Sequence, residues 1–345
     1  MIKIDGSFLE GGGQILRTSL GLSTVLEVPV EIFNIRKKRK NPGLAHQHLL
    51  VIKAFKEIFG AECEGDEIAS QKLIFYPSSK IKKEKEFYIK AETAASIGLI
   101  LQALLLPLVI MGEELSLKIE GGTRGKWAPP VDFFSNVVFP VLNINAQVSL
   151  VRRGYYPKGG GKIVVFLKKS MLKPINLMER GSLRKIKIES IASKELKRKD
   201  VALRQAREAK SILEGRFPQK MIEEEVFYVE TDSPSSEINL CAYFEKAILW
   251  SDGLGEKGKP SEVVAREAAF KLIEEIEKEA CCDRHLADHL IPYMVFCGGK
   301  FKTSFPTLHT LTNIWVCETI LGKKIFKVKD NIVEALCVER FLFNI

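Results

Sequence analysis

The sequence predicts an α+β fold, in which three repeated α/β units form a large domain and a smaller α/β domain is inserted among them. An order of helix and strand patterns that runs through residues 11–167 returns in residues 283–329. The segment between them, residues 182–279, has a different order of patterns and more charge. The sequence therefore predicts a large domain of residues 1–181 and 280–345 and an inserted domain of residues 182–279.

The first two units each combine two helices with the strands that follow them. Apolar residues at helical spacing predict the helices, and short apolar runs rich in β-branched residues predict the strands. The expected elements are a helix and a strand in residues 11–35, a helix within 46–65, a strand at 71–77, a helix at 96–110, a strand at 115–122, a helix at 131–144, and two strands joined by a glycine turn within 147–167.

The third unit and the inserted segment are predicted in the same way. The third unit has a helix at 283–296 and then a strand, a helix and a strand within 299–329. In the inserted segment, the helix at 200–216 carries charge on most faces, which predicts a solvated surface helix. The expected elements of the inserted domain are a strand at 183–192, that helix, strands at 224–232 and 236–244, and a helix at 260–280.

One apolar run, residues 94–112, is close to a membrane span in length. It contains Gln102 and Pro107, and Glu113 and Glu114 follow it directly. These residues favour a helix buried in the protein core over one that crosses a membrane.

Composition narrows the class of protein. The 345 residues carry a net charge of +9, which favours a polyanionic partner such as a nucleic acid or a nucleotide. The seven cysteines include no CxxC pair, so a disulfide framework and a structural zinc site are disfavoured and a reducing compartment is expected. The N-terminus has no apolar signal core. We therefore expect a cytoplasmic protein without a membrane partner.

Two segments contain the residue types of an anion site. In EGGGQILR, residues 10–17, three glycines precede a helix whose N-terminal N–H groups and dipole attract anions. Glu10 could hold a divalent cation there, and Arg17 could reach a phosphate. The spacing fits neither a P-loop nor a dinucleotide fingerprint, so a structural glycine turn is an equal alternative.

The second of these segments is a run of five cations, residues 36–40, before a proline turn and a helix. Guanidinium groups such as those of Arg36 and Arg39 suit two-pronged contacts to phosphate. Gln47 and His48 open the helix that follows. A phosphate site and a solvated basic loop are equally good interpretations of this run.

Two further segments could contact a nucleotide. GGTRGKWAPPVDFF, residues 121–134, places prolines and aromatic rings beside cations, which frames a flat base or simply makes a stiff entry to a helix. In DRHLADHL, the side chains of His285, Asp288 and His289 share one helix face. Two imidazoles without a cysteine or an HExxH pattern make zinc a poor fit, and hydrogen bonds to a nucleotide fit equally well.

The segment FPTLHTLTN, residues 305–313, places His309 near the start of a helix among threonines. An isolated histidine is more often structural than catalytic. The positions of all the histidines favour the catalytic interpretation. Every histidine lies at or near an expected loop-to-helix junction, and none lies in the inserted segment. The five are His46, His48, His285, His289 and His309.

With those segments in view, the chain resembles the RNA 3'-terminal phosphate cyclases, in the archaeal form of that family. The resemblance implies three repeats similar to the C-terminal domain of translation initiation factor 3, together with a smaller inserted α/β domain. The matching segments occur in the family's order over nearly the full length: DGSFLEGGGQILRTSLGLS, NPGLAHQHL, SIGLILQALLLP, GGTRGKWAPPVDF, RRGYYPKGGG, HLADHLIPYM and FPTLHTLTNIWVCE.

The resemblance implies a nucleotidyl-transferring ligase that uses ATP to convert an RNA 3'-terminal phosphate to a 2',3'-cyclic phosphodiester. A histidine takes AMP from ATP, AMP passes to the RNA phosphate to give RNA(3')pp(5')A, and the 2'-OH then displaces AMP. This logic suits a neutral imidazole in a site that neutralises phosphate charge. The implied residues are His309 as nucleophile, Glu10 as ligand of Mg²⁺ or Mn²⁺, Arg17, Arg36, Arg39 and Gln47 as further catalytic groups, and Gln102, Pro129, Phe133, His285, Leu286, Ala287, Asp288 and His289 as ATP contacts.

Bacterial members of the family tend to carry tyrosine in place of His285 and glutamine in place of His289, which leaves base selectivity open. The main alternative function is an RNA-binding scaffold, because non-catalytic relatives in ribosome biogenesis share the fold but lack the histidine. A lysine-adenylating ligase is a third candidate, because residues 3–6, KIDG, fit the KxDG pattern. Few residues precede Lys3 to build a nucleotide pocket, and the presence of His309 favours the cyclase.

Overall fold

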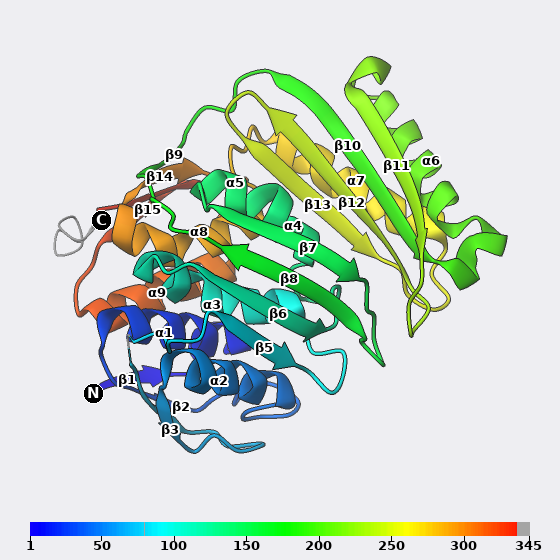
Figure 1. Cartoon of the computed structure of the whole chain (residues 1–345). Coiled ribbons are helices and arrows are strands. Elements are labelled where there is room, and N and C mark those ends of the chain that lie inside the picture. The colour runs from blue at the N-terminus through cyan, green and yellow to red at the C-terminus, as the bar shows by residue number, and fades with distance from the viewer. Residues whose placement is uncertain (79, 337–345) are drawn as a thin grey trace.

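The computed structural model describes residues 1–78 and 80–336 and has the α+β fold that the sequence predicts. The described chain forms four sheets of four strands each (Figure 1). Three of these sheets belong to the repeated units and the fourth to the inserted segment. Residues 337–345 of the predicted large domain lie outside the described residues.

The three repeated units share one topology. In each sheet the second strand of the unit pairs in parallel with the first and antiparallel with the fourth, and the third strand pairs with the fourth. The elements of the first unit are β1 (Ile2–Asp5), α1 (Gly13–Leu26), β2 (Val30–Phe33), α2 (His46–Phe59), β3 (Glu62–Glu64) and β4 (Leu73–Tyr76). Those of the second unit are β5 (Glu86–Lys90), α3 (Ile97–Met111), β6 (Leu115–Gly121), α4 (Val131–Phe133), the π-helix η1 (Phe134–Val138), α5 (Phe139–Leu142), β7 (Ala146–Arg152) and β8 (Gly161–Leu167). Those of the third unit are β9 (Ile175–Leu177), α8 (Arg284–Cys297), β14 (Gly299–Lys302), α9 (Leu308–Leu321), β15 (Phe326–Lys329) and β16 (Ile332–Ala335).

Each unit begins with a short strand that the sequence patterns did not reveal. β1, β5 and β9 have four, five and three residues. A run this short shows no clear period, and its place in the sheet comes from pairing with a later strand. One helix separates β1 and β5 from their partners, and the inserted segment and α8 separate β9 from β14. The predicted order, in which helices lead into strands, is therefore incomplete at its start.

The inserted domain interrupts the third unit and does not precede it. β9 ends at Leu177 and pairs in parallel with β14, and the third unit resumes only at α8. The residue boundaries 181/182 and 279/280 of the inserted domain stay predictions. The elements between β9 and α8 are β10 (Leu183–Ser193), the 3₁₀ helix η2 (Lys194–Lys199), α6 (Val201–Glu214), the 3₁₀ helix η3 (Gln219–Met221), β11 (Ile222–Val229), β12 (Ser236–Phe244), β13 (Ile248–Leu254) and α7 (Ser261–Glu277).

Two features of the inserted domain differ from the sequence prediction. β13 was not expected, because Ser251, Asp252 and Gly253 break its apolar pattern. α6 is not solvated on all sides, since the face that includes Ala206 and Leu213 is fully buried against the inserted sheet. Alanines on that face let a charged helix pack closely, and charge on the other faces hid this face in the sequence.

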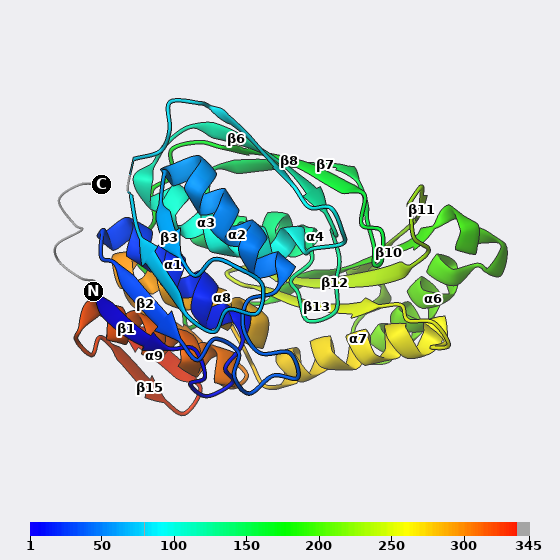
Figure 2. The same cartoon turned by 90° about the horizontal axis from the view of Figure 1, so that it is seen from below.

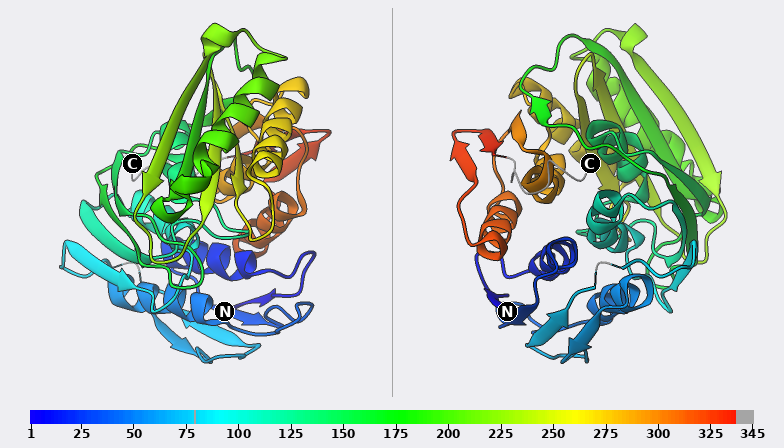
Figure 3. Two further views of the ribbon diagram at one scale, coloured as in Figure 1. Left: turned by 90° about the vertical axis from the view of Figure 1, so that its right-hand side faces the viewer. Right: turned by 60° about the vertical axis from the view of Figure 1, so that its left-hand side comes forward.

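The helices of the three units gather between their sheets (Figure 3). α1 contacts α3 and α9, and α8 contacts α9 and α3. α3 carries the apolar run and is buried among them, so the prediction of a core helix is confirmed: Leu101, Leu104 and Leu105 have no exposed surface. Among the described residues, no helix combines the length and apolar composition needed to cross a membrane.

A buried ion-pair network fastens the inserted domain to the second unit. Arg153, at the end of β7, donates to Asp132 of α4 at 2.8 Å and to Glu237 of β12 at 2.5 Å. Tyr155 donates a further hydrogen bond to Glu237, which has no exposed surface. Burial opposes the charge on Arg153, but the carboxylates of Glu237 and Asp132 hold the pKa of its guanidinium above the ordinary value.

Removal of this buried guanidinium is expected to destabilise the protein strongly. Arg153→Ala leaves Asp132 without its cation and leaves Glu237 with the more distant Arg124, at 3.9 Å, and we expect it to lower the free energy of unfolding by about 3–5 kcal/mol. The neighbouring Arg152→Ala is the matched control, because the ion pair between Arg152 and Asp232 is about 40% exposed and is worth less than about 1 kcal/mol. Urea unfolding of both variants checks this. Equal losses of stability would show that the network does not hold the two parts together.

Candidate active site

The N-terminal turns of three helices meet in one place. α9 begins at Leu308, and its N-cap Thr307 forms a reciprocal pair of hydrogen bonds with Thr310. α8 begins after Asp283, whose side chain accepts from the first backbone N–H groups of the helix. α1 begins after Gly12, which offers no side chain as a cap. Unsatisfied N–H groups at the start of α1 are therefore free to meet an anion.

His309 stands at the start of α9 and is held from α1. Gln14 of α1 donates from Nε2 to the backbone oxygen of His309 at 2.8 Å, and its Oε1 bonds to Nδ1 of the same residue. Glu10 Oε2 lies 2.8 Å from the same ring nitrogen and is buried without a hydrogen bond, because Gln14 is the acceptor there. Gln14 was not predicted as a site residue, although it lies inside the EGGGQILR segment.

These contacts fix the tautomer of His309. Both atoms that face Nδ1 are oxygens that only accept, so a neutral ring carries its proton on Nδ1 and leaves the lone pair of Nε2 free. Partial burial lowers the pKa of the ring, Glu10 opposes this, and the charges of Arg17 and Arg39 lower the pKa further. The half-exposed ring is therefore suited to act as a neutral nucleophile.

The three predicted arginines near this site differ in their contacts. Arg17 donates to Gln102 of α3 at 3.1 Å, and burial lowers its pKa to about 10, so it stays charged at pH 7. Arg39 lies 3.7 Å from Glu10 and against the backbone of Gly12. Arg36 turns back on its own loop, with a left-handed φ of 53° and a hydrogen bond to the Gly43 oxygen.

His48 also lies near Arg17 and Arg36, although its neighbour Gln47 was the predicted site residue. Gln47 is half-buried in the first turn of α2, whereas His48 is buried and its Nδ1 accepts from the backbone of Ala45 at 2.9 Å. A Cβ added at Gly13 would stand 2.3 Å from Nε2 of His48, so this glycine is required for the ring to fit. Burial and the nearby charges of Arg17 and Arg36 lower the pKa of His48 to about 3.

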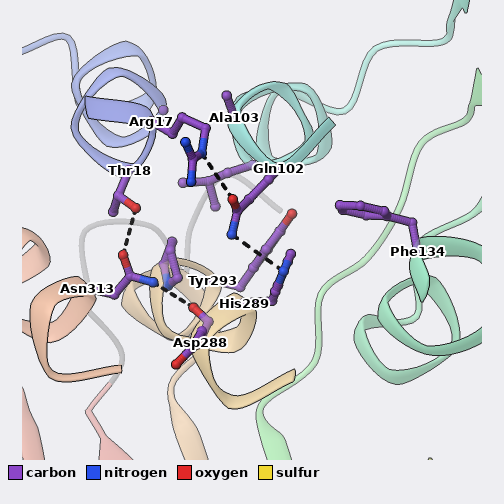
Figure 4. Close-up of a pocket in the computed structure, with 12 residues that line it drawn as sticks. Arg17, Thr18, Gln102, Ala103, Phe134, Asp288, His289, Tyr293 and Asn313 are labelled. Carbon is purple, nitrogen blue, oxygen red and sulfur yellow. Dashed lines mark hydrogen bonds between the residues drawn. The ribbon is translucent and has the colours of Figure 1, made fainter. Parts of the chain in front are cut away.

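Asp288 of α8 ties the helices together. Its Oδ1 accepts from the hydroxyls of Thr307 and Thr310, both at 2.6 Å, so it holds the turn that carries His309. Asn313 donates to the backbone oxygen of Asp288 and accepts from Thr18 of α1 (Figure 4). Burial raises the pKa of Asp288 to about 7, the threonine hydrogen bonds oppose this, and Glu10 adds to it.

The residues predicted to contact ATP split into an inner and an outer group. Gln102 and His289 meet at 3.4 Å beside Phe134 and line a cavity of about 20 Å³, which holds about one water molecule (Figure 4). His289 has its pKa lowered to about 3 by burial, and its ring packs against Phe133 at 5.2 Å between centroids. Leu286 and Ala287 have no exposed surface, so the predicted contact of these two residues with ATP stays a prediction.

The outer group lies towards the solvent. His285 is exposed at the start of α8, and Pro129 is half-buried. Phe133 is 1% exposed and packs on Trp250 of the inserted domain, so its ring is a wall of the site more than an open stacking surface. Trp250 was not expected near the site, because it lies on the strand β13 that the sequence patterns missed.

Comparison with known proteins identifies the family of the chain. Residues 8–327 match the family model for RNA 3'-terminal phosphate cyclase. Proteins named RNA 3'-terminal phosphate cyclase from three archaea are similar over most of their length. The one from Pyrococcus furiosus is 41% identical over 337 residues, which are 97% of each chain. The one from Desulfurococcus amylolyticus is 42% identical over 92% of this chain and 91% of its own. The one from Saccharolobus solfataricus is 40% identical over 94% and 96%. The chain belongs to the RNA 3'-terminal phosphate cyclase family.

Proposed function

We propose that this protein is an enzyme that uses ATP to convert an RNA 3'-terminal phosphate to a 2',3'-cyclic phosphodiester. The observation that carries the proposal is the state of His309, whose Nδ1 faces two acceptor oxygens and whose Nε2 is free. The relatives named as cyclases support the reaction class.

In the first step, Nε2 of His309 forms a bond to the α-phosphorus of ATP, and the bond to the bridging oxygen of the β-phosphate breaks. Pyrophosphate leaves, and the ring gains positive charge while Nδ1 keeps its proton. Gln14 accepts from Nδ1–H and so supports this charge through the step. The charges of Arg17 and Arg39 and the N-terminus of α1 stabilise the negative charge on the phosphates.

In the later steps AMP moves from the ring to the RNA. An oxygen of the RNA 3'-phosphate attacks the phosphorus of the histidine adduct, and the P–N bond breaks. The neighbouring 2'-OH then attacks the RNA phosphorus, loses its proton, and expels AMP. Adenylation matters because AMP is a far better leaving group than oxide, and the cyclic ester can then form.

A magnesium or manganese ion fits beside Glu10. Within the described ranges, no cluster of three or more His, Cys, Asp or Glu side chains is suited to hold a metal. Mg²⁺ does not need such a cluster, since it keeps several waters and binds one or two carboxylates together with substrate phosphates. The buried Oε2 of Glu10, which accepts no hydrogen bond, is a ligand of this kind. Bound there, the ion would supply charge neutralisation at the phosphates.

The geometry disfavours the two competing functions. A scaffold that only binds RNA has no use for a ring whose tautomer is fixed and whose Nε2 is free. In the ligase interpretation Lys3 would be the nucleophile, but Lys3 is exposed on β1 and alternates with Ile4, which faces the core. Lys3 therefore lies on the face of the sheet that points away from the helices.

His309→Ala is expected to abolish transfer of AMP to the protein, because it removes the ring nitrogen that would form the bond to the α-phosphorus. The measurement is incubation of purified protein with Mg²⁺ and α-labelled ATP, followed by denaturing electrophoresis. His46→Ala is the matched control, since His46 is an exposed histidine in the first turn of α2, and it should keep full labelling. Full labelling of His309→Ala would show that His309 is not the nucleophile.

Gln14→Ala is expected to slow adenylation by about 100-fold in single-turnover experiments, because the ring loses both its acceptor and its backbone clamp. Gln14→Glu keeps an acceptor for Nδ1–H and should recover part of the rate. The added negative charge also raises the pKa of His309, so the acid limb of the pH–rate profile should move to higher pH. A rate unchanged in Gln14→Ala, or an acid limb that stays fixed in Gln14→Glu, would contradict the role of Gln14.

Asp288→Asn tests the neutral state of this buried carboxyl, which avoids repulsion with the triphosphate. The folded protein keeps the proton of Asp288 up to about pH 7, whereas the unfolded chain loses it near pH 4. The stability of the wild type relative to Asp288→Asn is therefore greatest below pH 4 and should fall by about 2–4 kcal/mol as the pH rises to 7. Urea unfolding at pH 5 and pH 8 measures this. A difference that does not change with pH would show that Asp288 is ionised in the fold.

A further inference from the structure

A groove of about 750 Å³ lies between the second unit and the inserted domain, on the side of the second sheet away from its helices. One wall is formed by the end of β7 and the start of β8, and the other by η2 and the end of β11. Figures 1 and 2 both show the β7–β8 turn beside the strands of the inserted sheet. An ion pair and a hydrogen bond join the two parts: Arg152 pairs with Asp232 at 2.6 Å, and the backbone N–H of Lys158 donates to the hydroxyl of Ser233.

Cationic side chains lie on both walls of the groove, and each is paired with a carboxylate. Four of its lining side chains are cationic and two are acidic: Arg152, Arg153, Lys162 and Lys194, against Glu120 and Glu230. Lys162 pairs with Glu120 at 3.2 Å and Lys194 with Glu230 at 2.7 Å. Such exposed pairs are weak, so a phosphate can take the place of a carboxylate partner. Lys197 of η2 is also exposed and lies over the ring of Tyr228, a residue that lines the groove, at 5.8 Å.

Two highly exposed aromatic side chains lie on adjoining loops at the end of this groove. Tyr156 is 81% exposed, in the turn between the groove residues Arg153 and Gly160. Trp127 is 90% exposed and has a left-handed φ of 59°. The two loops are joined by a hydrogen bond of 2.9 Å from Thr123 to the Gly154 oxygen. Exposed rings beside cations are what single-stranded RNA requires, because its bases stack on flat side chains.

The groove is also connected to the candidate active site. Arg153 lines the groove and forms the ion pair with Asp132. Asp132 is followed by Phe133, whose ring packs against His289. Arg153, Asp132 and Phe133 therefore form the layer of side chains between the groove and the wall of the site that contains His309.

We propose that this groove binds the sugar–phosphate backbone of the RNA upstream of its 3'-terminal phosphate, with Tyr156 as a stacking surface for a base. The inference rests on the proposed cyclase function and gives the inserted domain a part in it, since η2 and β11 supply one wall. It applies to RNA chains long enough to extend from the active site into the groove.

The test uses the full-length protein and two 3'-phosphorylated RNAs of about three and about 20 nucleotides, which fall below and above the reach of one binding surface. We expect the double variant Lys194→Gln, Lys197→Gln to raise KM for the long RNA by about tenfold and to leave KM for the short RNA unchanged. The plot of log KM against log salt should become shallower by about 0.7 for each phosphate that the variant no longer neutralises. Adenylation of the protein by ATP alone should not change. Tyr156→Ala should raise KM for the long RNA at least about fivefold, and Tyr156→Phe should not.

The matched control is Arg216→Gln, Lys220→Gln, which removes two exposed cations beyond the opposite end of α6 and should change nothing. Binding of the labelled long RNA, followed by fluorescence anisotropy without ATP, keeps the test separate from cyclisation, so failure of the groove and failure of the proposed reaction are distinguishable. Equal effects of the groove variant on both RNAs, or on the control pair, would overturn the proposal. Displacement of the RNA by a poly-glutamate of equal length at equal concentration would assign the groove to acidic protein segments instead.

Discussion

The candidate active site depends on one contact between residues far apart in the chain, the double hold of Gln14 on His309. One amide group bonds to both the backbone and the ring of the histidine. The backbone bond places the start of α9 against the start of α1, and the ring bond selects the nitrogen that carries the proton. Position and tautomer of the ring are therefore set by the same side chain, and an error in helix packing would disturb both.

The packing that makes this contact possible follows from the repeated topology. Each unit places its helices on one face of its own sheet, and the helices of the three units bury their apolar faces against one another. The polar links described above between these helices lie in their N-terminal halves. Asp288 satisfies the hydroxyls of the α9 cap, and Asn313 links α8 to Thr18 of α1. The same links that close the core thus orient the reactive ring.

The sequence predicted the long elements, and it failed where the structure depends on distant partners. Helices such as α3 and α8 have enough residues to show their apolar spacing, whereas β1, β5 and β9 are defined by pairing. The resemblance to the cyclases also assigned His309, Glu10 and Arg17 to one site before any fold was known. The partners of the ring could not be found in this way, because Gln14 lies 295 positions from His309 and its role appears only when α1 and α9 meet. Trp250 was missed for a related reason, since the strand that carries it has polar residues at its centre.

The charges of the site explain why so many histidines can stand together. His48 and His289 are buried near Arg17, and burial together with that charge keeps both rings neutral at pH 7. Burial raises the pKa of Asp288 to about 7, so this carboxyl keeps its proton below that pH. The fixed positive charge therefore comes from arginine, which does not lose its proton, and from helix N-termini. The arginines and helix N-termini of such a site hold their charge over a wide pH range. Its neutral rings can form hydrogen bonds and pack, and the ring of His309 can act as a nucleophile. The pH dependence of adenylation should then report His309 together with its neighbours Asp288 and His285, and Asp288→Asn removes the effect of Asp288.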